Sequence, residues 1–141
     1  MKKAVIYYTS KTGITKKLGE NIKDYLNEKG ISTEFQSTDE ILETKTEGAD
    51  YVLLGCWTGG LMLLFQGPTK KWIGFAKKLP ELDPSKTILF TTYKIRTGSM
   101  FRNMKKHLKT KSMDSSYTEI KSKNSTLDAH AKILLDKFIT N

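Results

Sequence analysis

Hydrophobic and polar positions along the chain follow two alternating rhythms. Short runs of β-branched and aromatic residues predict five strands, at 3–8, 31–35, 51–55, 87–92 and 116–120. Apolar residues spaced three and four apart predict four helices, at 14–26, 72–79, 100–108 and 127–138, and residues 40–43 favour a brief helical turn. This alternation is typical of parallel strands joined by right-handed crossovers. We therefore expect a single α/β domain over residues 1–141, a three-layer sandwich with a parallel sheet in the middle.

Two details of the pattern refine this picture. Residues 51–55 are apolar without alternation, as in a strand that is covered on both faces. The uncharged stretch runs on to Thr69 and is 19 residues long, close to a membrane span, but its glycines, Pro68 and threonines oppose a helix in lipid. We therefore expect a strand followed by a loop over 55–67. Near the C-terminus, Ser125-Thr126-Leu127-Asp128 has the form of a capping box and predicts the start of the last helix.

Composition narrows the class of protein. The chain has 24 Lys and Arg and 15 Asp and Glu, so its net charge is +9. Cys56 is the only cysteine, which excludes an internal disulfide and a zinc site built from several thiolates. His107 and His130 fall on separate predicted helices without a partner at ligand spacing, so we expect no metal. The first apolar run is too short for a secretion signal, and we expect a reduced, cytoplasmic protein without a membrane span.

The turn after the first predicted strand carries the clearest chemistry. Its sequence, Ser10-Lys11-Thr12-Gly13-Ile14-Thr15, combines hydroxyls with a glycine at a strand-to-helix junction. Hydroxyls, turn amides and the positive end of the helix would together surround a small anion. The turn has neither the spacing of a Walker A motif nor a GxGxxG pattern, which favours a single phosphate monoester over a triphosphate or a dinucleotide. An ordinary capped helix start is the alternative interpretation.

The same turn carries a family resemblance. A strand followed by Ser-x-Thr-Gly-x-Thr at the start of a helix resembles the FMN phosphate loop of flavodoxins. Residues 50–55, then Gly67-Pro68 before a helix, then residues 89–93 follow in the order that flavodoxins have. The resemblance implies a flavodoxin-like five-stranded parallel sheet of order 2-1-3-4-5. It also implies FMN across the ends of the first, third and fourth strands.

By this resemblance, three segments would bind FMN. The phosphate would be held by hydroxyls and amides of Ser10, Lys11, Thr12, Gly13, Ile14 and Thr15. At the position of Ile14, flavodoxins often have Asn. The flavin ring would lie against the segments after the third and fourth strands, which supply Cys56, Trp57, Thr58, Gly59, Gly60, Thr91, Thr92, Tyr93 and Gly98. Trp57 and Tyr93 would flank the two faces of the ring, with packing in or around the core as the alternative for both. Cys56 is interpreted as a small buried side chain, and Gly59-Gly60 as a place where a peptide unit can turn over.

Charge is unevenly distributed along the chain. Between Asp83 and Asp114 there is no acidic residue, but there are eight Lys and Arg, whereas residues 34–50 hold six acids and one base. The resemblance places the basic segment beside the flavin, where it would attract acidic redox partner proteins. We also expect Lys94 or Arg96 to favour a reduced, anionic flavin nearby and so to raise the potential of its second reduction. A solvated, lysine-rich helix is the alternative for this segment.

The apolar run Leu61-Met62-Leu63-Leu64-Phe65 stands where a polar loop would be expected. It could shield the flavin, form a dimer contact, or receive a flat apolar substrate such as a quinone or a tetrapyrrole. An early helical turn packed into the core is the alternative.

Three functions are compatible with these observations. The first is an FMN-binding electron-transfer protein, a monomer or weak dimer, that acts between redox proteins. The second is a small FMN-dependent reductase of an apolar or anionic substrate. The third is a flavin-free binding module whose basic face contacts an acidic protein or nucleic acid. No known nucleic-acid motif is present, so we do not expect a nucleic acid as a partner.

Overall fold

Five parallel strands form the centre of the computed structural model, which describes residues 1–39, 46–61, 64–111 and 115–140. The strands are β1 (Lys3–Thr9), β2 (Ser32–Ser37), β3 (Tyr51–Trp57), β6 (Thr87–Thr92) and β7 (Thr118–Ser122). They pair in the order β2-β1-β3-β6-β7, and every pair in this sheet is parallel. Counted among the parallel strands alone, this is the predicted order 2-1-3-4-5.

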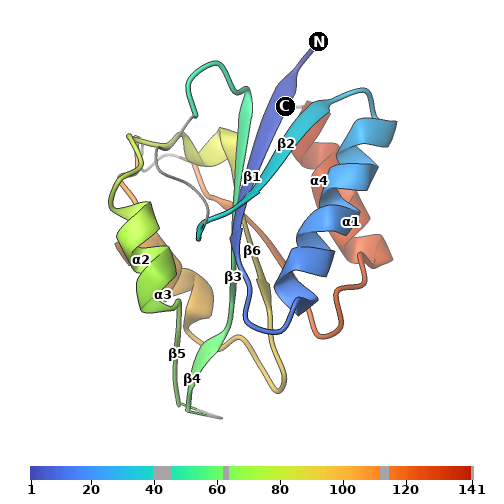
Figure 1. Cartoon of the computed structure of the whole chain (residues 1–141). Helices are drawn as coiled ribbons and strands as arrows, with labels where there is room; N and C mark the ends of the chain where they lie inside the picture. The colour runs from blue at the N-terminus through green and yellow to red at the C-terminus, as the bar shows by residue number, and fades with distance from the viewer. Residues whose placement is uncertain (40–45, 62–63, 112–114, 141) are drawn as a thin grey trace.

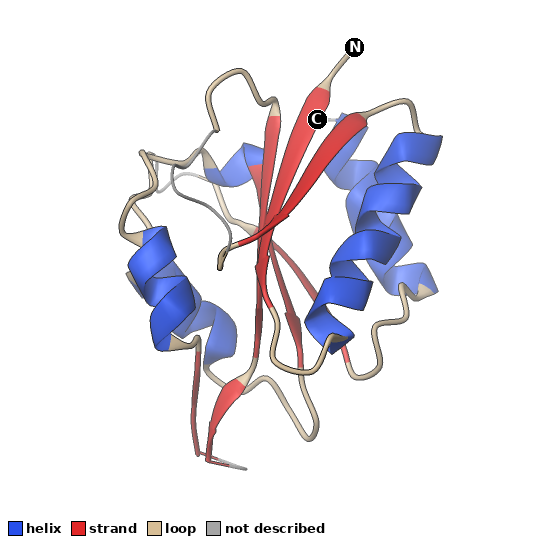
Figure 2. Ribbon diagram, viewed as in Figure 1, coloured by secondary structure: helices blue, strands red, loops and turns tan. Residues whose placement is uncertain are grey.

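Helices cover both faces of the sheet (Figures 1 and 2). On one face lie α1 (Ile14–Glu28) and α4 (Ala129–Thr140), and on the other lie α2 (Lys70–Ala76) and α3 (Met100–Lys106). A short 3₁₀ turn, η1 (Pro84–Lys86), precedes β6. The three-layer sandwich is therefore confirmed, and the helical turn predicted at 40–43 lies outside the described residues.

The central strands are buried on both faces, as their unbroken apolar pattern predicts. On β3, Tyr51 and Leu53 pack in the core under α1 and α4, whereas Leu54 and Cys56 pack in the core under α2 and α3. Gly55 makes room for the ring of Phe90, because a side chain at position 55 would collide with it: a Cβ there would lie 2.7 Å from Cδ2 of Phe90. Within the described part of the chain, the helices are too short or too polar to cross a membrane.

The segment after β3 differs from its prediction. Instead of an open loop, it forms a small antiparallel hairpin of β4 (Gly59–Leu61) and β5 (Leu64–Gly67). The backbone of this glycine-rich stretch pairs with itself, which hydrophobic periodicity does not register. Met62 and Leu63 lie outside the described residues, so the roles considered for the run 61–65 stay predictions.

The predicted capping box is wrong. Ser125 has φ +71°, which is left-handed, and its carbonyl oxygen accepts a hydrogen bond from Asn21 at 2.8 Å. The helix α4 begins at Ala129, where the Asp128 carboxylate accepts the amide of Ala131 at 2.8 Å. A contact with a distant helix thus holds Ser125 in a turn, and capping falls to Asp128.

Candidate functional site

The carboxyl ends of three strands meet at one edge of the sheet. Thr9 of β1 is level with Cys56 of β3, and Cys56 is level with Thr91 of β6. A cavity of about 300 Å³ opens at this edge. Among the described residues, its lining comes from the first turn, β3, β5, β6 and the segments that follow: Lys11, Thr12, Ile14, Thr15, Trp57, Thr58, Gln66, Thr92, Tyr93, Lys94, Ile95, Arg96 and Lys123.

The predicted phosphate loop forms one wall of the cavity. Gly13 caps α1 with φ +92°, a left-handed conformation that glycine adopts at little cost. The Oγ atom of Ser10 accepts hydrogen bonds from the amides of Gly13 at 3.0 Å and Lys16 at 3.3 Å. Ser10 therefore shapes the loop from within, while Thr12 and Thr15 line the cavity. The first turn of α1 contains no acidic residue, so its positive end is not neutralised by its own side chains.

Threonine hydroxyls join the strand ends beneath the cavity. Oγ1 of Thr15 lies 2.7 Å from Oγ1 of Thr92, and Oγ1 of Thr58 lies 2.9 Å from Oγ1 of Thr91. Thr91 in turn donates to the carbonyl oxygen of Cys56 at 2.6 Å. Because these hydroxyls are mostly buried and satisfy one another, they fix the relative positions of α1, β3 and β6.

Two aromatic residues, Trp57 and Tyr93, stand at the cavity, each half-buried. Lys11 Nζ lies 5.2 Å from the centroid of the Trp57 ring. The Nζ atoms of Lys121 and Lys123 lie 6.0 and 5.9 Å from the centroid of the Tyr93 ring. These distances are within the range of cation–π attraction, so each ring has at least one lysine ammonium group close to it.

The rim of the cavity is basic and partly apolar. Lys94, Arg96 and Lys123 line it together with Lys11, and its described lining contains no Asp or Glu. Ile95 is 47% exposed and Ile14 is 41% exposed, and few other large apolar side chains among the described residues are as exposed. An exposed apolar rim among cations is suited to contact with an acidic surface.

Eight of the predicted binding residues line this cavity: Lys11, Thr12, Ile14, Thr15, Trp57, Thr58, Thr92 and Tyr93. Ser10 and Gly13 shape the loop instead, and Gly59 and Gly60 lie in β4. Thr91 is fully buried beneath the cavity and does not reach the described lining.

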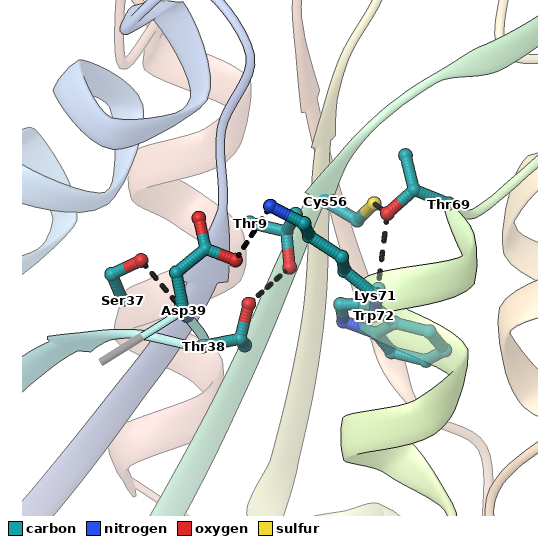
Figure 3. Close-up of polar contacts among 8 residues, drawn as sticks. All are labelled: Thr9, Ser37, Thr38, Asp39, Cys56, Thr69, Lys71 and Trp72. Carbon is teal, nitrogen blue, oxygen red and sulfur yellow. Dashed lines mark hydrogen bonds and ion pairs between the residues drawn. The ribbon is translucent and has the colours of Figure 1, made fainter. Parts of the chain in front are cut away.

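Cys56 is not part of the described lining either. Its side chain is fully buried on the α2 side of the sheet, where its Sγ lies 3.8 Å from Oγ1 of Thr69 (Figure 3). Burial raises the pKa of the Cys56 thiol to about 11, so the thiol stays protonated near neutral pH. This burial agrees with the interpretation of Cys56 as a small apolar side chain, and its expected place beside a flavin ring stays a prediction.

Sequence reasoning missed Gln66, which lines the cavity and is 5% exposed. Its carbonyl oxygen accepts hydrogen bonds from Ser99 Oγ at 3.0 Å and Asn103 Nδ2 at 2.6 Å. Gly98 is close to its side chain, since a Cβ on Gly98 would lie 2.8 Å from Cδ of Gln66. Gly98 therefore makes room for Gln66 rather than lining the cavity. No sequence motif identifies Gln66 as a site residue, because it reaches the carboxyl edge of the sheet only through the β4–β5 hairpin.

Comparison with solved structures establishes the fold. Two-electron reduced flavodoxin of Megasphaera elsdenii matches with a TM-score of 0.71 at 19% identity, over 98% of this chain and 99% of that one. Oxidised flavodoxin 1 of Bacillus cereus matches with a TM-score of 0.67 at 13% identity, over 99% and 98%. Rubredoxin:oxygen oxidoreductase of Desulfovibrio gigas matches at 0.67 and 15% identity, over 98% of this chain and 34% of that one.

Comparison with curated protein sequences gave no significant match. A family profile described as "Flavodoxin domain", in contrast, matches residues 5–131, which is most of the chain. The profile match includes the phosphate loop, most of β1 and the other four parallel strands. By this match the chain belongs to the flavodoxin family, whose members bind FMN and transfer electrons.

Proposed function

We propose that this protein is an electron carrier that binds FMN in the cavity at the carboxyl edge of its sheet. The phosphate would bind at residues 10–15, and the flavin ring would lie against Trp57 and Tyr93. One observation carries the proposal: a hydroxyl-rich helix start and two aromatic residues, distant in sequence, line the same cavity.

The chemistry of the loop fits a phosphate. Hydroxyls of Thr12 and Thr15 lie at the start of α1, whose backbone amides point out of the helix and whose first turn holds no acid. Lys11 adds a positive charge to the same wall. A hydroxyl can donate as well as accept, so Ser10 could turn from the amides of the loop toward an incoming oxygen.

The rest of the cavity fits a flat, partly polar ring. Its volume of about 300 Å³ is at the lower end for small-molecule sites. Trp57 and Tyr93 offer aromatic surface, and Gln66 offers a carboxamide, which has a donor and an acceptor side by side. Such a group is complementary to a ring edge that alternates N–H and C=O.

Bound FMN would supply the capacity to take up and release electrons, and the protein would supply binding, orientation and electrostatics. Trp57 and Tyr93 would keep water from the ring faces. Lys94, Arg96 and Lys123 would stabilise negative charge that reduction adds nearby, which raises the reduction potential.

The same cations support the proposal that the redox partners are acidic proteins. The surface around the cavity places exposed Ile14 and Ile95 beside Lys11, Lys94 and Arg96. An acidic partner would be steered toward this rim by charge and held there by apolar contact. We propose that the protein works in the cytoplasm and as a monomer or weak dimer.

Titration of the flavin-free protein with FMN and with riboflavin tests the proposal. We expect FMN to bind about 100-fold more tightly, since a phosphate held by several charge-assisted hydrogen bonds contributes on the order of 3 kcal/mol. Quenching of flavin fluorescence by the nearby aromatic rings would report binding of both. Equal affinities, or no uptake of FMN, would contradict the proposal.

A further inference from the structure

A second cavity, of about 450 Å³, lies beside the first and is not used by the proposed function. It lies along β7, the edge strand of the sheet, between α3 and the start of α4. Tyr93 lines both cavities, so the two share a wall. The second cavity is within the size range of small-molecule sites.

Apolar residues from three elements contribute to the lining of this cavity. They are Phe101 of α3, Ile120 of β7, and Ala131 and Leu134 of α4. With the ring of Tyr93, Phe101 provides a second aromatic surface. Flat apolar groups gain both desolvation and ring contact in such surroundings.

The charged side chains in the lining differ in whether they form ion pairs or capping hydrogen bonds. Glu119 forms an ion pair with Lys105, and the Asp128 carboxylate accepts the amide of Ala131 at 2.8 Å. Both carboxylates of the lining thus have partners. Arg102 and Lys121 are exposed, and neither forms an ion pair with a described acidic residue.

We infer that this cavity binds a small planar aromatic anion, a carboxylate or a sulfonate. The aromatic body would contact the rings of Phe101 and Tyr93, and the anionic group would meet Arg102 and Lys121. Arginine suits this role because its planar guanidinium can hydrogen-bond both oxygens of a carboxylate. The cavity is distinct from the phosphate loop, so the inference adds a second ligand to the protein.

The shared wall couples the two sites. If FMN binds as proposed above, the anion and the flavin both contact Tyr93. Each ligand then changes the protein's affinity for the other by the same factor. Only this coupling depends on the proposed function; binding of the anion does not.

Titration with 2-naphthoate, followed by methyl NMR of the whole protein with and without FMN, tests the inference. We expect shifts at Ile120 and Leu134 in the second cavity rather than at Ile14 and Ile95 in the first. The neutral analogue 2-naphthamide should bind about 10-fold more weakly, because it lacks the charge that Arg102 and Lys121 attract.

Three variants sharpen the test. R102Q and K121Q should each weaken 2-naphthoate binding about fivefold, as expected for one exposed charge contact. K132Q is the control, since Lys132 is exposed on α4, which contributes other residues to the lining, but does not itself line the cavity. It should leave the affinity within about twofold, in line with a screened surface charge. Circular dichroism would verify that all three variants are folded.

The outcomes separate the two ideas. Absence of naphthoate binding, shifts confined to Ile14 and Ile95, or equal losses in all three variants would each overturn the inference. Failure of FMN to bind would overturn the proposed function alone, because the shifts at Ile120 and Leu134 are measured without FMN as well.

Discussion

Thr15 and Thr92 are 77 residues apart in the sequence, yet their side-chain hydroxyls lie 2.7 Å from each other. Thr15 is in the first turn of α1, and Thr92 is the last residue of β6, directly before Tyr93. Both side chains are buried, with exposed fractions of 1% and 5%. This hydrogen bond therefore links the proposed phosphate loop to the strand that carries an aromatic wall of the cavity.

Removing both of these hydroxyls should cost less than the sum of the two single removals. In T15V or T92V, the remaining buried hydroxyl loses its partner, and we expect a loss of about 1–3 kcal/mol in the free energy of unfolding. The double variant should lose less than the sum, because valine fills nearly the same volume and no orphan hydroxyl remains. Urea unfolding of the four proteins measures the coupling, and strictly additive losses would show that the hydrogen bond is unimportant.

Gly98 should resist substitution because of Gln66. Gly98 has φ +51°, and an added Cβ would press on the Gln66 side chain. We expect G98A to lower the free energy of unfolding by about 1–3 kcal/mol and to weaken FMN binding, since a left-handed alanine is strained and Gln66 must move.

G74A is a matched control for that variant. Gly74 lies in α2, and a Cβ there meets nothing within 4 Å. Alanine should stabilise this helix by about 0.5–1 kcal/mol and leave FMN binding unchanged. Thermal unfolding and FMN titration of both variants check the contrast, and equal behaviour of the two would argue against a role for Gln66.

Charge reversal at the cavity should lower the reduction potential of bound FMN. Lys94 and Arg96 line the cavity, and reduction adds negative charge to the flavin. For K94E and R96E, we expect potentials lower by about 20–60 mV each, from the loss of attraction at a partly solvated distance. K137E, at the exposed far end of α4, carries the same charge change as a control. The test is redox titration of the three variants. Equal shifts of the reduction potential in K94E, R96E and K137E would show that the effect does not depend on charge at the cavity.

Cys56 should make stability depend on pH in the alkaline range. Burial raises the pKa of this thiol to about 11, whereas the pKa of an unfolded thiol is about 8.5. The unfolded chain therefore releases this proton first as pH rises. The contribution to stability is complete below pH ~8.5 and is lost as pH increases toward 11, by about 3 kcal/mol in total.

The C56A variant isolates this effect. Its free energy of unfolding should be lower than that of the unchanged protein at pH 8 and should fall less steeply toward pH 11. Unfolding in urea across this range measures both slopes. Identical slopes would mean that the Cys56 thiol titrates in the folded state as it does in the unfolded chain.

Local sequence patterns were sufficient to predict the parallel strands, the helices beside them and the phosphate loop of the candidate site. The unbroken apolar run of β3 and the three-and-four spacing in α1 each describe a segment's own surroundings, so they can be read without knowing the fold. The sequence of Ser10 to Thr15 likewise contains its own strand end, glycine turn and helix start. For these reasons the parallel sheet, its layers and the loop were all predictable.

Other features depended on pairing between distant segments. Gln66 reaches the cavity because the β4–β5 hairpin turns the chain back, and Asp128 caps α4 because Asn21 holds Ser125 in a left-handed turn. Cys56 lies next to Trp57 in sequence, yet strand alternation directs it into the core under α2.

By itself, the sequence determined the order of the five parallel strands and the helices, the family and the phosphate-like turn, because each is encoded within short stretches of residues. Only the tertiary structure decided which side chains share a cavity. It brought Lys123 and Lys121 to Tyr93 and divided the space around that ring into two cavities. The physical reason is that sheet register and helix packing set these distances, and both depend on contacts between residues far apart in the chain.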